Sequence, residues 1–141
     1  MKRIASAVWK GDLKSGLGTL SSDSGVLSET KYSFSTRFEN GIGTNPEELI
    51  GAAHAGCFSM ALSGQLGKAG LTAESINTQA TVKLEKTEAG FTITQVHLEV
   101  LVKIPGADQK VFDEAAKNAK SGCPVSRLLN AEITMNAVLE S

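Results

Sequence analysis

The sequence predicts an α+β fold in which an antiparallel β-sheet packs on one long buried helix. From Leu49 to Gly67 there is no charged residue, whereas a helix at the surface would show a polar stripe. Residues 76–84 and 96–104 instead alternate apolar with polar side chains, which is typical of half-buried strands. Strands on both sides of the long helix, with a shorter helix before the last strand, favour an antiparallel sheet covered by helices.

Three short strands separated by glycine-containing turns are expected before the long helix. The third is expected from its alternation, which places the aromatic side chains and Thr36 on one face and lysine, arginine and two serines on the other. These strands are residues 2–9, 17–21 and 31–38.

The long helix is expected over residues 45–69, with Asn45 as its N-cap and Pro46 at its first position. Gly70 is suited to ending it. A helix of about 24 residues spans about 36 Å, which is more than a domain of this size buries by itself. Its many small residues allow another backbone to come close. We therefore expect a homodimer with the central helices at its core.

A β-hairpin is expected after this helix, with its turn at Glu88–Gly90. The apolar positions of its second strand change phase between Ile93 and Val96. Such a slip predicts a β-bulge near Thr94 and Gln95.

The C-terminal part should contain two helices and a last strand. Asp108 can cap a helix over residues 109–120, whose apolar side chains fall on one side. Pro124 is suited to the first position of a short helix ending near Leu129, which places Cys123 at its N-cap. Residues 132–139 form the last strand.

Composition limits the possible partners. With 141 residues, we expect a single domain over residues 1–141. A formal net charge of −1 and 5% aromatic residues give no basis for binding nucleic acid or an anionic membrane surface. The central helix carries His54 and Gln65 among glycines and serines, so we do not expect it to span a membrane. No apolar signal region follows Met1, and two cysteines then favour a reducing compartment, the cytoplasm.

The two cysteines lie in different local settings. Burial in mid-helix would by itself make Cys57 inert. Cys123, at the start of a helix, should face free backbone N–H groups and be the more acidic thiol. Local physics therefore names Cys123 as the primary nucleophile, while composition alone would leave two buried, inert thiols. Their wide separation in the sequence leaves contact between them open.

Three further residues are candidates for a thiol site. His54 lies one turn before Cys57, either as a base or donor for the thiol or as a histidine bonded to backbone in a small pocket. Arg37 is either a solvated strand residue or the partner of Glu47, since a guanidinium and a carboxylate pair in bidentate fashion. Glu47 lies about 15 Å along the helix from Cys57, so it would act on the thiol only through that arginine.

No metal or cofactor is expected. The cysteines and the histidines, His54 and His97, show no standard ligand spacing. The sequence contains no phosphate loop and no dinucleotide-binding fingerprint.

Two motifs resemble one known family. They are Thr44–Phe58, with the sequence TNPEELIGAAHAGCF, and Gly122–Ser126, with the sequence GCPVS. Both are similar to the osmotically inducible protein C and organic hydroperoxide resistance family, closest to its osmotically inducible branch, and the likeness covers essentially the whole chain. The resemblance implies thiol-dependent peroxidases that act on hydroperoxides, organic ones above all. It also implies intertwined homodimers with two active sites at the subunit interface.

The resemblance also assigns roles. Cys57 falls on the family's peroxidatic cysteine and Cys123 on its resolving cysteine, which reverses the ranking from local acidity. Arg37 falls on the catalytic arginine and Glu47 on the glutamate that orients it. The family's reductants are lipoyl-type dithiols. A non-catalytic, stress-induced dimer that binds a ligand or senses oxidation is the alternative.

Overall fold

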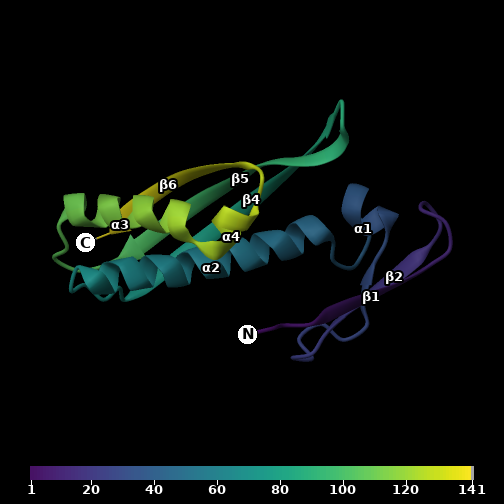
Figure 1. Ribbon diagram of the computed structural model, residues 1–141, viewed down its shortest axis with the longest axis horizontal. Helices are drawn as coiled ribbons and strands as arrows, with labels where there is room; N and C mark the ends of the chain where they lie inside the picture. The colour runs from purple at the N-terminus through teal and green to yellow at the C-terminus, as the bar shows by residue number, and fades with distance from the viewer. Residues whose placement is uncertain (141) are drawn as a thin grey trace. The chain divides into compact units, whose positions relative to one another are not determined.

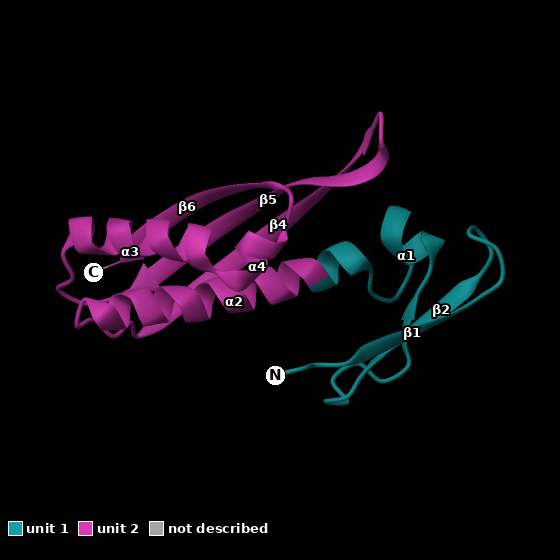
Figure 2. Ribbon diagram, in the orientation of Figure 1, with its two compact units in different colours: residues 1–49 teal, residues 50–141 magenta. Residues whose placement is uncertain are grey.

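The computed structural model describes residues 1–140. The chain folds into two compact units, Met1–Leu49 and Ile50–Ser141 (Figure 2). The long helix α2, Pro46–Lys68, begins in the first unit and continues through the second.

The first unit contains a three-stranded antiparallel sheet and a short helix. The strands pair in the order β1-β2-β3, so each strand lies beside its neighbour in sequence. Asp12 shapes the β1–β2 turn by accepting hydrogen bonds from the backbone N–H groups of Lys14 and Ser15. The elements are β1 (Ala5–Lys10), β2 (Leu17–Ser22), β3 (Thr30–Tyr32) and α1 (Phe34–Phe38).

The strand predicted over residues 31–38 is wrong beyond Tyr32, because the chain turns there into helix α1. Ser33 and Thr36 form a capping box: the Ser33 hydroxyl accepts from the Thr36 N–H at 3.3 Å, and the Thr36 hydroxyl accepts from the Ser33 N–H at 2.8 Å. These local hydrogen bonds satisfy the first N–H groups of a helix, and they outweigh the alternating pattern. As a result, Phe34 and Phe38 lie one turn apart and contact each other with tilted rings, the centroids 4.8 Å apart and the planes at 44°.

The second unit contains a three-stranded sheet in the order β4-β5-β6. Strands β4 (Ser75–Thr87) and β5 (Gly90–Lys103) form the predicted hairpin. The predicted bulge is confirmed: Lys83 pairs with Gln95 and Leu84 with Ile93, which leaves Thr94 as the extra residue. Helix α3 (Gln109–Gly122) begins at the predicted N-cap Asp108, whose side chain accepts the Val111 N–H.

The expectation of a purely antiparallel sheet is wrong for the last strand. Strand β6 (Glu132–Glu140) pairs with β5 in parallel, so the sheet is mixed. Helices α3 and α4 (Pro124–Leu128) lie between β5 and β6 in the sequence. They form the kind of long crossover that returns the chain to the beginning of the neighbouring strand and makes parallel pairing possible (Figure 1).

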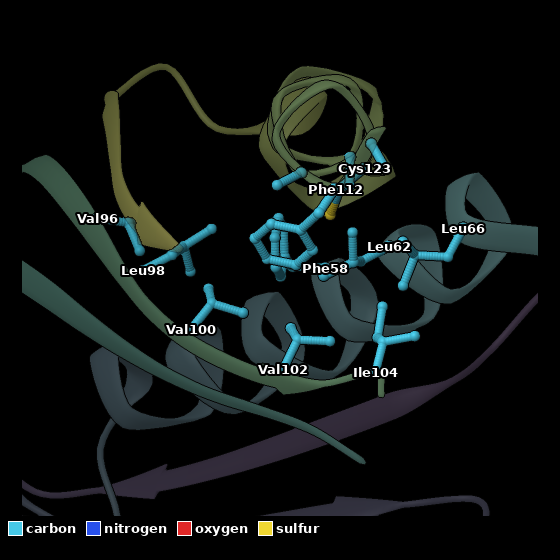
Figure 3. Packing of buried hydrophobic residues seen from close by; sticks show 13 residues of the cluster. Phe58, Leu62, Leu66, Val96, Leu98, Val100, Val102, Ile104, Phe112 and Cys123 are labelled. Atoms are coloured by element: carbon cyan, nitrogen blue, oxygen red, sulfur yellow. The ribbon is translucent and has the colours of Figure 1, made fainter. Parts of the chain in front are cut away.

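The core of the second unit lies between β5 and the helices α2 and α3. Phe58, Leu62 and Leu66 recur every four residues on α2 and are fully buried. They pack with Phe112 of α3 and with the inward side chains of β5 (Figure 3). Burying a side chain of this size contributes about 1.5–3 kcal/mol to stability. This cluster fixes α2 and α3 on the sheet, and Cys123 belongs to it.

The prediction that α2 is buried nearly all round is not met within the described chain. The helix buries one stripe, which besides the three core residues includes Gly51 and His54. Its opposite face is exposed, with Met60 at 79% of its full accessibility. That face is made of small residues and one methionine: Ala52, Ala53, Gly56, Met60, Ser63, Gly64 and Gly67. No helix within residues 1–140 is long and apolar enough to cross a membrane.

Candidate active site

The two cysteines, which are distant in sequence, meet in the second unit. The Cys123 thiol donates a hydrogen bond to the sulfur of Cys57, and the two sulfurs are 2.9 Å apart. Both thiols are free; Cys57 is half-buried and Cys123 is fully buried within the core cluster. Figure 3 shows Cys123 in this cluster. The structure therefore answers the question of contact that the sequence left open. Disulfide formation between them requires no large movement of either helix.

The junction between α3 and α4 places the Cys123 sulfur. Its N–H donates to Ala119 O at 3.0 Å as the last bond of α3, and its carbonyl accepts the Arg127 N–H at 3.0 Å as the first bond of α4. Pro124 has no N–H, so α3 cannot continue through it, and it starts α4 instead. The chain bends at Cys123, and the side chain faces α2.

The predicted advantage of Cys123 as an N-cap thiol is not realised. Its side chain makes no capping hydrogen bond to α4. The backbone N–H of Val125 in the first turn of α4 instead acts on Cys57, whose pKa it lowers. The donor that favours a thiolate therefore acts on Cys57, because the bend at Pro124 turns the start of α4 toward α2.

Burial nonetheless raises the pKa of Cys57, and the neighbouring Cys123 thiol raises this pKa further. The Val125 N–H lowers the pKa but does not reverse the shift. None of the described groups that set this pKa is a cation. A reactive thiolate at neutral pH therefore needs a positive charge in addition to the groups around Cys57 in the second unit.

His54 is fully buried, and its contacts differ from both predicted alternatives. Its Nε2 is 2.7 Å from the hydroxyl of Ser126, so it is bonded neither to a thiol nor to backbone through that atom. Its Nδ1 is buried without a hydrogen-bond partner among residues 1–140. Burial lowers the pKa of His54, which favours a neutral ring. Sequence reasoning missed Ser126; the signal was its place three residues after Cys123 in the GCPVS motif.

Arg37 and Glu47 form an ion pair in the first unit. Arg37 Nη2 is 2.7 Å from Glu47 Oε1, and Nε is 3.1 and 3.2 Å from the two carboxylate oxygens. Arg37 lies in the last turn of α1 and Glu47 in the first turn of α2. The predicted pairing is confirmed. Because Glu47 is 11% exposed and Arg37 38%, the carboxylate is fixed by its surroundings and the guanidinium remains accessible.

An apolar cavity of about 300 Å³ lies beside Arg37 in the first unit. Arg37 is its one charged lining residue. The other lining residues are mainly large and apolar: Trp9, Leu13, Tyr32, Ser33, Phe34, Phe38 and Pro46. A second cavity of about 440 Å³ in the same unit contains none of the four predicted site residues.

No metal site is found among residues 1–140: no three His, Cys, Asp or Glu side chains come together in a way that would hold an ion.

The fold and the site define a small α+β protein with two free thiols in contact between helices. The chain belongs to the OsmC-like protein family, whose model matches residues 39–138. It is 57% identical over 135 residues to peroxiredoxin OsmC of Escherichia coli strain K12, covering 96% of this chain and 94% of that protein. It is 26% identical over 124 residues to the organic hydroperoxide resistance protein OhrB of Bacillus subtilis, covering 87% and 89%.

Solved structures show the same fold. The crystal structure of OhrB from Bacillus subtilis matches with a TM-score of 0.68 at 24% identity, covering 97% of this chain and 98% of that one. An OsmC-like protein of unknown function from Vibrio cholerae matches with a TM-score of 0.78 at 19% identity, covering 98% and 99%.

Proposed function

We propose that this protein reduces organic hydroperoxides, with Cys57 as the peroxidatic thiol and Cys123 as the resolving thiol. The chain is a cysteine-based peroxidase, because a relative 57% identical over nearly its whole length is a peroxiredoxin. The observation that supports the pairing of these two thiols is the 2.9 Å contact between their sulfurs. The roles of the two are assigned by the family resemblance. Residues 39–138, which match the family, run through both compact units. This supports one functional domain over residues 1–141.

The disulfide forms in two steps, and only the first of them consumes peroxide. The Cys57 thiolate attacks the distal oxygen of the hydroperoxide, the O–O bond breaks, and the alkoxide leaves and takes up a proton to become the alcohol. Cys57 is then a sulfenic acid. The Cys123 sulfur attacks the Cys57 sulfur, the S–O bond breaks, and water leaves as the disulfide forms. A dithiol then reduces the disulfide by exchange. By family resemblance we propose a lipoyl-type dithiol and a cytoplasmic location.

Arg37 is proposed to supply the missing positive charge. The groups around Cys57 in the second unit leave its pKa raised, chiefly through burial. A guanidinium favours the thiolate and also stabilises the charge that develops on the leaving oxygen. Glu47 fixes this guanidinium through the 2.7 Å contact. Unlike lysine, arginine stays charged and can bind the carboxylate with one edge while its other N–H groups remain available.

The cavity beside Arg37 supports an alkyl hydroperoxide as the substrate. Its volume of about 300 Å³ suits a small organic molecule. Its aromatic and aliphatic lining would bury an alkyl group, while the guanidinium binds the peroxide end. Hydrogen peroxide would gain nothing from the apolar lining, so we propose that it is the weaker substrate.

An intertwined homodimer is proposed from the exposed face of α2. At Gly56, Gly64 and Gly67 an added Cβ would meet nothing within 4 Å. Glycine in a helix costs about 1 kcal/mol relative to alanine, so these three have no rationale within the single chain. The close approach of a second backbone explains them. The exposed Met60 in the same face would then become buried.

Peroxide turnover tests the function. The parent and Cys57→Ser are each given tert-butyl hydroperoxide and excess dihydrolipoamide, and the remaining peroxide is measured over time. The parent should consume many equivalents per chain, whereas Cys57→Ser should consume peroxide only at the background rate. A protein that merely senses oxidation would consume one equivalent and stop. Equal rates for the parent and Cys57→Ser would overturn the proposed mechanism.

A further inference from the structure

We infer that the hydrogen bond between His54 and Ser126 positions Cys123 for its attack on oxidised Cys57. The inference rests on the proposed function, because it concerns the resolving step of that reaction. In this role His54 and Ser126 are positioning residues, since neither needs to touch the peroxide or a sulfur.

The two contacts form parallel links between the same two segments. His54 and Cys57 are three residues apart on α2, and therefore lie on one face of that helix. Cys123 and Ser126 are likewise three residues apart at the start of α4. The pairs meet as His54 Nε2 to Ser126 Oγ at 2.7 Å and as Cys57 to Cys123 sulfur at 2.9 Å. Two links one helical turn apart fix both the position and the rotation of α4 on α2.

Helix α4 benefits from such a link because its own packing is slight. It has five residues, and none of them is buried. A helix this short has almost no stability of its own. Val125 and Leu129 pack against the core only in part. The Ser126 hydroxyl therefore adds a side-chain link between α4 and α2 to the interaction of the Val125 N–H with Cys57, and it helps to hold the Cys123 sulfur at the preceding residue.

The alternative that His54 acts directly on a thiol does not fit the contacts. Its Nε2 is engaged by Ser126, and its Nδ1 is buried without a partner among the described residues. A general base needs a hydrogen-bonded path to the proton that it takes. The His54 ring is fully buried and one of its nitrogens has no partner among the described residues. The hydrogen bond from its other nitrogen to Ser126 is therefore the polar contact that accounts for a histidine at this position.

The resolving step is the step of the reaction that should depend on the contact between His54 and Ser126. In that step the Cys57 S–O bond breaks, an S–S bond to Cys123 forms, and the Cys123 proton leaves with the hydroxyl as water. If α4 is released, Cys123 spends less time within reach of the sulfenic acid. Cys123 forms and breaks no bond in the first oxidation. Release of α4 weakens two opposing effects on the pKa of Cys57, the Cys123 thiol that raises it and the Val125 N–H that lowers it, so the rate of that step should change less than the ratio does.

The test is a partition experiment on the full-length reduced protein. One equivalent of tert-butyl hydroperoxide is added in the presence of dimedone, which traps sulfenic acid. Mass spectrometry then gives the ratio of the Cys57 dimedone adduct to the Cys57–Cys123 disulfide. In Ser126→Ala this ratio should rise by about 3- to 10-fold, the factor that a hydrogen bond between neutral groups commonly supplies. Ser126→Thr keeps the hydroxyl and should restore the parent ratio.

Ser59→Ala is the matched control. Ser59 also lies on α2 and makes a 2.8 Å hydroxyl hydrogen bond, but its partner is Thr78 on β4 instead of α4. This variant should keep the parent ratio. His54→Phe, which keeps a buried ring without its nitrogens, should behave like Ser126→Ala. Combining the two should add little, because both remove the same link.

The outcomes separate this inference from the proposed function. If the parent forms neither adduct nor disulfide, the proposed function fails. If the parent forms the disulfide and Ser126→Ala has the same ratio, the positioning role is wrong and the function stands. A ratio that rises equally in Ser59→Ala and Ser126→Ala would also overturn the inference, because general loosening of the fold would then be the cause.

Discussion

The carboxylate of Glu47 accepts hydrogen bonds from both Nε and Nη2 of Arg37, and the shortest of these contacts is 2.7 Å. This ion pair joins the last turn of α1 to the first turn of α2. It selects one orientation of a long side chain that would otherwise sample many. The value of Glu47 to the reaction is therefore expected to lie in holding the guanidinium still.

Glu47→Gln should slow the first oxidation of Cys57 by about 3- to 10-fold, because a partly exposed ion pair contributes modestly. The measurement is the rate of thiol loss in stopped flow with tert-butyl hydroperoxide. Glu48→Gln is the matched control, since Glu48 lies in the same first turn but is exposed and does not bind Arg37. Equal slowing in both variants would indicate an effect of the helix dipole and would contradict the orienting role.

Arg37→Lys should slow the first oxidation by about 10- to 100-fold at neutral pH, because lysine cannot reproduce the two-nitrogen contact. Burial already raises the pKa of Cys57. Without the guanidinium the thiolate should form only at still higher pH, so the variant should regain rate as the pH rises. Thiolate absorbance near 240 nm, followed against pH, checks this. Arg3→Lys, at an exposed arginine, serves as control. A pH profile unchanged from the parent would mean that Arg37 does not act on the thiol.

Cys123→Ser should oxidise at Cys57 at nearly the parent rate and then stop as the sulfenic acid, because the resolving sulfur is missing. Excess peroxide should take Cys57 further to the sulfinic acid, seen as an added mass of two oxygens. The parent should show the Cys57–Cys123 disulfide after one equivalent. A disulfide between two chains in the parent would contradict the pairing read from the 2.9 Å contact.

Acidification should destabilise the protein through His54. Burial lowers the pKa of His54 in the folded state, so the unfolded chain binds the proton more readily. His54 therefore has no effect on the free energy of unfolding above a pH of about 6.5, and it lowers that free energy as the pH falls below this value. Urea unfolding at pH 7.5 and 5.5 measures the difference. His54→Phe should reduce the pH dependence, whereas His97→Gln, at a histidine that solvent reaches, should keep it.

Gly56→Ala distinguishes a dimer interface from a free helix face, because it should raise stability on a free face and weaken association in an interface. On a free face alanine should stabilise by about 1 kcal/mol, because it favours the helix and meets nothing. In an interface the added methyl group should weaken association instead. Light scattering after size exclusion and thermal unfolding measure the two effects. Met60→Glu should also yield monomer, and Asn118→Glu, on the exposed side of α3, should not. A monomeric parent would end the dimer proposal.

Elements with strong local signals were predicted well from the sequence. The side chain of Asn45 accepts the Glu48 N–H at 2.8 Å and so caps α2 as predicted. The cap of α3, the hairpin turn and the bulge at Thr94 likewise follow from a few neighbouring residues. The same reasoning failed at residues 33–38, where two patterns competed. Alternation favoured a strand, but the capping box between Ser33 and Thr36 decided for a helix.

The same contrast between local signals and long-range contacts holds for the candidate site. The sequence by itself determined which side chains are available for chemistry: two thiols, a histidine one turn from Cys57, and an arginine with a carboxylate partner. Only the tertiary structure decided that the thiols touch, that the Val125 N–H lowers the pKa of Cys57, and that His54 binds Ser126. It also decided that β6 pairs in parallel. The physical reason is that local hydrogen bonds and periodicity act over a few residues, whereas these contacts depend on how α4, α2 and the sheet pack across long separations in the chain.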